Sequence, residues 1–377
     1  MKFIVSSQLL YKHVNYVSRV VPSRPVLPIL EYFLFELNQG QLTITATDLE
    51  VTMTTSLPVE SQDQGKIAVK AKILTETLSK LPEQPITIKF DEETRAIEIN
   101  SDSGKYKQVG ENPNDYPQPH TVDKGIQVQM PAALLLKGIS STLFAVSKDD
   151  MRPAMMGVLF HFTPQGLNFV ATDAHCLAKY AFSDITTPEE YRIIIPEKAL
   201  TILQRVLQSS ENNIVTIEFN QSSAAFYLDG TRMNCRLIEE RFPDYQNVIP
   251  VDSPNQVIVN TDSFIKALKL VSLYSNAHTH QIRLKIQGNM LTLNAEDLEF
   301  ANEASEYIPC GHEGEDMEIG FNANMLLNVV SNIPSKETTF MMSTPNRACL
   351  VVPTENDANE SLIMLIMPVM LSSPSYS

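Results

Sequence analysis

Apolar and polar residues along this chain follow a pattern that recurs six times. Each recurrence begins with a short alternating segment that predicts a β-strand. It continues into an amphipathic segment that predicts a helix, and returns to alternating segments that predict further strands. The predicted helices lie at residues 6–20, 71–81, 131–146, 197–208, 261–274 and 322–332. We therefore predict six strand-helix-strand units in sequence.

A longer period groups these units in pairs. Three predicted strands end at Asp48, Asp173 and Asp297, which are 125 and 124 residues apart. Pro-rich turns around an Asp-Tyr pair, at 111–119 and 241–250, close the first two thirds of the chain. We therefore predict three similar domains, at residues 1–125, 126–253 and 254–377.

The order of the elements predicts the fold class. Strands joined mostly by hairpins, with one helix per unit, favour antiparallel sheets that carry helices on one face, which is an α+β fold. If each neighbouring pair of units adds a constant rotation, the units form an arc. Such an arc can close into a ring, either within one chain or by head-to-tail association of copies.

The predicted helices carry a charge opposite to that of the whole chain. The 377 residues include 29 Lys and Arg against 44 Asp and Glu, a formal net charge of -15. The helical segments hold three acids, Glu76, Glu197 and Asp262. Their nine basic residues are Lys12, Arg19, Lys72, Lys80, Lys137, Lys198, Arg205, Lys266 and Lys269.

A basic helical face in an acidic protein is typical of a ring whose inner surface attracts the phosphates of duplex DNA, without preference for sequence. The acidic exterior would discourage wrapping by other DNA. The alternative is that the helices only present solvated Lys and Arg opposite their apolar stripes. Charge alone leaves both interpretations open.

The composition argues against export and against a membrane span. The longest apolar run, Leu362–Leu371, is about half the length of a spanning helix, and Pro368 interrupts it. The N-terminus lacks the apolar core of a signal peptide. The cysteines are too far apart for a CxxC motif: Cys176, Cys235, Cys310 and Cys349. We therefore expect a cytoplasmic protein with reduced thiols.

The candidate catalytic groups are few. Asp173 and His175 lie two residues apart at a strand end, where alternate side chains share a face, and could suggest acid-base chemistry. Asp48 and Asp297 recur at equivalent positions without such a histidine, which favours a turn-capping role for all three aspartates. We expect no catalytic site.

Motifs for metals and nucleotides are also weak. His278 and His280 form an HxH pattern, but no cluster of carboxylates or cysteines adjoins it, and a surface loop explains it better. Neither GxGxxG nor GxxxxGK[ST] occurs. We expect no cofactor and no bound metal.

Several segments resemble the bacterial sliding clamps, the beta subunits of DNA polymerase III, from MKF at residue 1 to MPVML at 367–371. The matching segments are SRPVLPIL at 23–30, TDLEVTM at 47–53, GVLF at 157–160, VATDAHCLA at 170–178, RFPDYQNVIP at 241–250 and MEIGFN at 317–322. The resemblance implies a DNA clamp fold of three domains, with sheets outside and helices inside, in a head-to-tail homodimeric ring. It further implies a processivity factor that encircles duplex DNA, tethers the DNA polymerase III alpha subunit, and is opened by a separate clamp loader.

The resemblance also implies an apolar groove between the second and third domains, where partner proteins insert a short motif of Gln followed by Leu and Phe. The residues that match the groove pattern are Thr172, His175, Leu177, Pro243, Val248, Asn322, Met367, Pro368 and Leu371. We include their neighbours Met155, Cys176, Met325, Cys349, Leu365, Ile366, Val369 and Met370. A methionine-rich apolar segment can adapt to several related peptides. Without the resemblance, a buried final strand followed by a frayed end explains the same segment.

This chain departs from the family pattern in the groove. Ala174 and Cys176 stand where the family often has Gly and Arg, and Met370 stands where Arg often precedes the last leucine. The predicted groove is therefore more apolar and less basic. The chain also continues beyond Leu371 as SSPSYS, a tail expected to leave the groove open or to lie across its mouth.

For DNA, the resemblance points to Arg24 and Arg152. At the ring interface it places Tyr106 of one chain opposite Leu273 and Tyr274 of the other, with Gln108 in place of an apolar family residue. Complementary charges are expected there from Lys105, Lys107, Glu299, Glu303 and Glu306. Each such pair contributes little stability at a surface but helps orientation.

Two other functions fit parts of the same pattern. A peptide-binding scaffold that never meets DNA would need only the groove, with its basic helices merely solvated. A hydrolase centred on Asp173 and His175 would lose turnover on His175→Ala.

Overall fold

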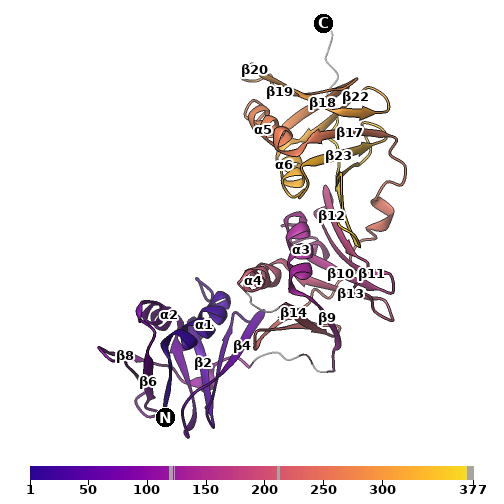
Figure 1. Cartoon of the computed structure of the whole chain (residues 1–377). Helices are drawn as coiled ribbons and strands as arrows, with labels where there is room; N and C mark the ends of the chain where they lie inside the picture. Colours follow the sequence, from indigo (N-terminus) through magenta and orange to yellow (C-terminus); the bar gives the residue numbers. More distant parts are fainter. Residues whose placement is uncertain (119–121, 123, 210–212, 372–377) are drawn as a thin grey trace. The chain divides into compact units, whose positions relative to one another are not determined.

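The computed structural model describes residues 1–118, 122, 124–209 and 213–371 (Figure 1). The chain divides into two compact units, each described by itself below. Unit 1 consists of Met1–Leu136 and Lys198–Leu237, and unit 2 of Lys137–Glu197 and Ile238–Ser377. The predicted SSPSYS tail lies outside the described residues.

The structure confirms the helices predicted from the apolar periodicity, with small shifts at their ends. They are α1 (Ser7–Val17), α2 (Ala71–Lys80), α3 (Ala132–Thr142), α4 (Glu197–Gln208), α5 (Thr261–Ser272) and α6 (Ala323–Ser331). Polar side chains begin several of them: Ser6, Asn260 and Asn322 each accept a hydrogen bond from a backbone N–H of the first turn. Within unit 1, α1 and α2 lie side by side, as do α5 and α6 within unit 2 (Figure 1).

Unit 1 contains two antiparallel sheets. The eight-stranded sheet has the order β5-β2-β3-β4-β16-β15-β14-β9, and the four-stranded sheet has the order β1-β6-β7-β8. The strands of the larger sheet are β2 (Tyr32–Asn38), β3 (Gln41–Thr47), β4 (Val51–Pro58), β5 (Gln64–Lys70), β9 (Ile126–Pro131), β14 (Ile214–Phe219), β15 (Ser223–Leu228) and β16 (Thr231–Arg236). Those of the smaller are β1 (Lys2–Ser6), β6 (Pro85–Phe90), β7 (Ala96–Asn100) and β8 (Lys105–Val109).

Unit 2 repeats this design. Its nine-stranded sheet has the order β13-β10-β11-β12-β25-β24-β23-β17-β21, and its four-stranded sheet has the order β20-β19-β18-β22. The larger sheet comprises β10 (Gly157–Thr163), β11 (Gly166–Thr172), β12 (Cys176–Phe182), β13 (Tyr191–Pro196), β17 (Asn255–Asn260), β21 (Gly311–Glu313), β23 (Glu337–Met342), β24 (Cys349–Pro353) and β25 (Glu360–Ile366). The smaller comprises β18 (Gln281–Gln287), β19 (Met290–Asp297), β20 (Asn302–Pro309) and β22 (Met317–Asn322).

These sheets confirm the α+β prediction and add a feature that the periodicity did not predict. In each unit the larger sheet joins strands that are far apart in the chain: β4 pairs with β16, and β12 pairs with β25. We call these two pairings the first and second junctions. Each junction buries apolar side chains on both of its strands, for example Met53 opposite Met233 and Leu177 opposite Leu365.

Among the described residues, no helix is long and apolar enough to cross a membrane.

Candidate partner-binding site

The turn that follows β11 brings several predicted site residues to the second junction. One carboxylate oxygen of Asp173 accepts hydrogen bonds from the backbone N–H groups of His175 (2.8 Å) and Cys176 (2.6 Å). The Thr172 hydroxyl donates to the Cys176 carbonyl at 2.7 Å and accepts from the Ala174 N–H at 3.1 Å. The predicted capping role of Asp173 is therefore confirmed, and Asp48 and Asp297 accept equivalent backbone bonds.

Ala174 occupies a backbone conformation that suits glycine. Its φ angle is 74°, in the left-handed region that side chains with a Cβ disfavour. The departure from glycine at this position therefore stores strain beside the candidate site.

Hydrogen bonds hold the final segment of the chain against this turn. In the second junction, Ile366 lies opposite Cys176 on one side and Cys349 on the other. The Met367 N–H then donates to the His175 carbonyl at 2.8 Å, and the Val369 N–H donates to the Gly320 carbonyl at 2.9 Å.

Gly320 on β22 admits the segment because it has no side chain. A Cβ at this position would lie 2.7 Å from both the Val369 carbonyl oxygen and Leu371 Cδ2. Residues 367–371 are thus fixed between the Asp173 turn and β22.

The predicted groove residues divide into a buried floor and an exposed layer. Leu177 and Leu365 belong to a buried cluster that also contains Phe242, Tyr245 and Leu350. The other buried members of the prediction are Thr172, Cys176, Cys349 and Ile366. Burial raises the pKa of the Cys176 thiol to about 12, so this cysteine is a packing residue and not a thiolate nucleophile.

The exposed layer consists of Val248, Met367 and Met370, whose exposed fractions are 53%, 41% and 83%. The remaining members are half-buried or exposed: Met155, His175, Pro243, Asn322, Met325, Pro368, Val369 and Leu371. We call the exposed and half-buried members the partner surface. Large exposed apolar side chains over a buried apolar floor are typical of a peptide-docking surface.

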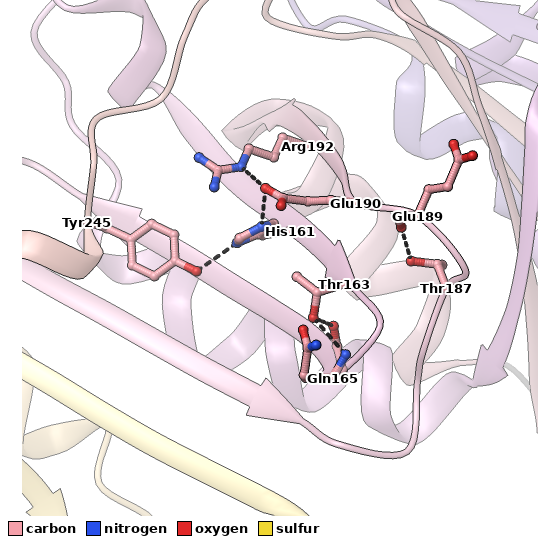
Figure 2. Close-up of polar contacts among 9 residues, drawn as sticks. His161, Thr163, Gln165, Thr187, Glu189, Glu190, Arg192 and Tyr245 are labelled. Carbon is pink, nitrogen blue, oxygen red and sulfur yellow. Dashed lines mark hydrogen bonds and ion pairs between the residues drawn. The ribbon is translucent and has the colours of Figure 1, made fainter.

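One contact beneath this surface was not predicted from the sequence. Tyr245, in the segment that also contains Pro243 and Val248, hydrogen-bonds through its hydroxyl to Nδ1 of His161 at 2.7 Å (Figure 2). His161 lies in β10, 84 residues away in the sequence. The RFPDYQNVIP motif marks the tyrosine, but no local pattern marks its partner.

The basic residues predicted for DNA fall into two groups. Seven are exposed on the surface: Lys12, Arg24, Lys72, Lys80, Arg205, Lys266 and Lys269. The others contact acids or backbone within their own unit. Lys137 pairs with Asp357 (2.6 Å) and with Glu360, Lys198 pairs with Asp48 (2.6 Å) and Glu50 (2.9 Å), and Arg152 pairs with Asp149 (2.8 Å). Arg19 donates to the carbonyl of Arg205 near the end of α4.

The residues predicted for the ring interface lie on or beside two sheet edges. Tyr106, on β8, is 39% exposed, whereas Leu273 and Tyr274, just after α5, are 76% and 42% exposed. Within their own chain, Lys105 and Lys107 already approach Glu98, at 2.7 and 3.8 Å. Gln108 is half-buried, Glu306 is half-buried, and Glu299 and Glu303 are exposed.

Sequence reasoning missed three large apolar side chains at this second edge. Leu298, Phe300 and Tyr307 lie on β20 or the turn before it, with exposed fractions of 83%, 72% and 67%. The recurring Asp-Leu-Glu pattern places Leu298 at a turn, but it does not indicate that the turn stays uncovered in one chain.

The alternative chemistry finds little support in the geometry. His175 is exposed, while Asp173 is engaged in capping its own turn. Within the described ranges, no cluster of three or more His, Cys, Asp or Glu side chains could hold a metal ion.

Comparison with known proteins gives a consistent result along the chain. Family models described as the N-terminal, central and C-terminal domains of the DNA polymerase III beta subunit match residues 1–120, 129–244 and 246–368. A beta sliding clamp of Proteus mirabilis is 28% identical over 373 residues, which cover 98% of this chain and all of the relative. A beta sliding clamp of Synechococcus elongatus is 27% identical over 380 residues, which cover 99% and 100%.

Solved structures agree with these relatives. The DNA polymerase III subunit beta of Pseudomonas aeruginosa superposes with a TM-score of 0.93 at 27% identity, covering 98% of this chain and 100% of that chain. The sliding clamp of Bartonella birtlesii bound to griselimycin has a TM-score of 0.90 at 29% identity, with the same coverage.

Proposed function

The chain belongs to the DNA polymerase III beta subunit family, the sliding clamps, and from this premise we propose how its strands and side chains perform the family's task. It is a DNA polymerase processivity factor and not an enzyme: a ring-shaped clamp that encircles duplex DNA and tethers the replicative polymerase. We propose three domains at residues 1–125, 126–253 and 254–377, and action in the cytoplasm.

The observation that carries the ring is a pair of unmatched sheet edges. The first junction joins β4 to β16 and the second joins β12 to β25. By the repeat, β20 corresponds to β4 and β12, and β8 corresponds to β16. In the described part of the chain, β20 and β8 are each the end strand of a four-stranded sheet. An open edge is a template for pairing with another chain, so β20 of one copy and β8 of a second copy form the remaining junctions of a head-to-tail homodimer.

The repeat also supplies the register of this proposed pairing. The backbone N–H of Glu111 donates to the Ala68 carbonyl, and in the next repeat the N–H of Ile238 donates to the Ile194 carbonyl. Glu111 and Ile238 are therefore equivalent positions, and the same offset makes Lys105 the equivalent of Arg232.

The β2–β3 and β18–β19 ladders make Glu296 the equivalent of Thr47, and Glu296 pairs with Glu303 as Thr47 pairs with Thr52, so Glu303 is the equivalent of Thr52. By the same offset as Lys105, Lys107 is the equivalent of Asn234. Because Asn234 lies opposite Thr52, Lys107 would lie opposite Glu303 of the other subunit.

The same offsets place two other residues at this interface. Cys235 lies opposite Val51 in the first junction. Gln108 is the equivalent of Cys235 and Asn302 is the equivalent of Val51, so these two amide side chains would meet across the interface.

A charge swap tests the register. Lys107→Glu or Glu303→Lys alone should weaken dimerisation about two- to five-fold in sedimentation experiments, and the double swap should recover most of the loss. Lys105→Glu is the matched control, because its equivalent Arg232 lies opposite Thr54, the counterpart of Ser305. Equal effects of the two lysine variants, with no recovery in the double swap, would reject the register.

We further propose that the partner surface binds peptide motifs from the DNA polymerase III alpha subunit, the clamp loader and other clamp-binding proteins. The exposed methionines and Val248 support this assignment, because flexible thioether side chains adapt to related Leu and Phe side chains. Met370, in the exposed layer, makes the partner surface more apolar than an arginine would, so salt should affect peptide affinity little.

For DNA, we propose that Arg24, Lys72, Lys80, Arg205, Lys266 and Lys269 contact phosphates in preference to Lys137, Lys198, Arg152 and Arg19; Lys12 is exposed but also has a contact within the chain. Lys137, Lys198, Arg152 and Arg19 already have acidic or carbonyl partners. To bind a phosphate, each would have to give up these contacts. Contacts with phosphates position the duplex without reading its sequence.

The experiment that tests the clamp measures its release from DNA. The protein loaded onto nicked circular DNA should dissociate slowly, and it should be lost rapidly once that DNA is linearised, because a topological link ends when a ring slides off an end. Equal dissociation from the two DNA forms would instead support a peptide-binding scaffold that never encircles DNA.

A further inference from the structure

His161 is a buried titratable residue that the clamp function does not require. It lies in the middle of β10 and is 3% exposed, yet both of its ring nitrogens have partners (Figure 2). Nδ1 lies 2.7 Å from the Tyr245 hydroxyl, and Nε2 lies 2.9 Å from a carboxylate oxygen of Glu190. The same carboxylate oxygen accepts a hydrogen bond from Nε of Arg192 at 2.8 Å.

These partners determine which ring nitrogen of His161 carries the proton. Hydrogen bonds from Arg192 and from His161 lower the pKa of Glu190, so the carboxylate is ionised and can only accept. Nε2 must therefore donate to Glu190, and in the neutral ring Nδ1 must accept. Burial raises the pKa of Tyr245, which keeps its hydroxyl protonated and able to donate to Nδ1.

Tyr245 connects this chain of hydrogen bonds to the partner surface. Its ring packs in the same buried cluster as Leu177 and Leu365, the floor of that surface. Phe242, two residues before the Asp244-Tyr245 pair, belongs to the same cluster. Residues 241–250 are coil except for a short 3-10 helix, Gln246–Val248, so side-chain anchors largely determine their position.

We propose that His161 is a positioning residue for the partner surface. It holds Tyr245, and with it the 242–249 segment that presents Pro243 and Val248, while Glu190 and Arg192 at the exposed end fix the tautomer that makes this hydrogen bond. This inference deepens the proposed peptide-binding role and rests on it.

Unit 1 contains a natural contrast to this arrangement. Tyr116 is the repeat equivalent of Tyr245, and its hydroxyl approaches the backbone carbonyls of Tyr32 (3.1 Å) and Thr45 (3.3 Å). The position equivalent to His161 is Glu36, which forms an ion pair with Lys66 on the neighbouring strand. Of these two equivalent tyrosines, Tyr245 depends on a titratable side chain for its anchor and Tyr116 depends on backbone carbonyls.

Two measurements on the full-length protein test the proposal. The first is hydrogen exchange at residues 242–249, and the second is the affinity for the synthetic peptide Gln-Leu-Ala-Leu-Phe, followed by fluorescence anisotropy. The variants are Tyr245→Phe and His161→Leu, with His161→Gln as the conservative variant because its amide oxygen can still accept from Tyr245. The matched control is Tyr116→Phe, which removes the equivalent hydroxyl in the other unit.

Tyr245→Phe and His161→Leu should speed hydrogen exchange at residues 242–249. Each should also lower the affinity for the peptide about five-fold, which is the effect of one lost hydrogen bond. His161→Gln should recover part of the affinity. Tyr116→Phe should lower thermal stability while leaving both the exchange at 242–249 and the peptide affinity unchanged.

Unchanged exchange at 242–249 in Tyr245→Phe and His161→Leu would overturn the positioning role, whatever the peptide does. So would equal loss of peptide affinity in Tyr116→Phe, because the effect would then be one of general stability. Failure of the wild-type protein to bind the peptide would refute the proposed partner surface, whereas the exchange experiment would still decide whether His161 positions Tyr245.

Discussion

The turns at Asp48 and Asp173 share one backbone design but lie in different surroundings. In both, the aspartate caps the turn. The residue directly after the aspartate has a positive φ angle, 80° at Leu49 and 74° at Ala174. The first turn is closed by Lys198, which pairs with Asp48 and Glu50. The second turn instead receives the apolar segment 367–371 through the His175 carbonyl.

The difference teaches how a repeated fold can place the proposed partner surface at one of its turns. Capping bonds are local and recur at Asp48, Asp173 and Asp297. The proposed partner surface requires in addition the segment 367–371 that follows β25, and among the described residues no equivalent segment reaches the Asp48 turn. Four predictions test this contrast between a closed and an open junction.

The largest effect is expected at Gly320. Gly320→Ala would place a Cβ against the Val369 carbonyl and Leu371, and should displace residues 367–371. Overpacking of this kind costs about 1–3 kcal/mol, so affinity for the Gln-Leu-Ala-Leu-Phe peptide should fall about ten-fold or more in anisotropy titrations. Gly311→Ala is the control, because its Cβ would meet only Ile258, at 3.6 Å. Wild-type peptide affinity in Gly320→Ala would show that the final segment does not shape the surface.

The closed junction should respond to the loss of Lys198. Lys198→Met leaves the Asp48 side chain, which is 4% exposed, without its cation. Since the lysine itself is half exposed, we expect a loss of only about 1 kcal/mol in chemical denaturation, smaller at high salt. Peptide affinity should not change. A lower peptide affinity in Lys198→Met would contradict the prediction that the first junction does not affect the partner surface.

Relief of backbone strain should stabilise the open turn more than the closed one. Ala174→Gly should raise the free energy of unfolding by about 0.5–1 kcal/mol, because glycine adopts the left-handed conformation without strain. Leu49→Gly should gain less or lose stability, since Leu49 also lines a cavity with Pro117 and Thr52. Thermal unfolding of the two variants would decide; equal gains would mean that the Leu49 side chain contributes nothing.

The smallest effect concerns pH. Burial lowers the pKa of His161 below its usual 6.5, although the hydrogen bond to Glu190 opposes this shift. The charged groups around the ring are Glu190 and Arg192 at its exposed end and Lys179 on β12, with Tyr245 at Nδ1. The folded state therefore binds fewer protons than the unfolded state just below pH 6.5, so stability from this group is complete above pH 6.5 and declines as the pH falls below it.

Protonation would also convert Nδ1 into a donor and remove its bond from Tyr245. Peptide affinity should therefore weaken about two-fold between pH 7 and pH 5.5 in the wild-type protein, and less in His161→Gln. A pH profile identical in the two proteins would exclude His161 as the responsive group.

Much of this fold follows from local patterns in the sequence. Amphipathic periodicity placed the helices within a few residues, because the face that each helix buries is written at a spacing of 3.6 residues. The recurring aspartates Asp48, Asp173 and Asp297 marked the capped turns, because an aspartate bonds to N–H groups only two or three residues away. The family motifs marked His175, Leu177 and Met367, which the structure brings together at the second junction.

The anchors of the site depend on residues that are distant in the chain. His161 meets Tyr245 across 84 residues and Lys137 meets Glu360 across 223, and the ladders β4·β16 and β12·β25 join segments that no periodicity links. A local pattern records which face of an element is buried but not what covers it. The sequence by itself thus determined the repeated units and their capped turns. Only the tertiary structure decided which turn pairs with a lysine and which receives the final apolar segment, because that choice depends on which remote segment pairs with the neighbouring strand.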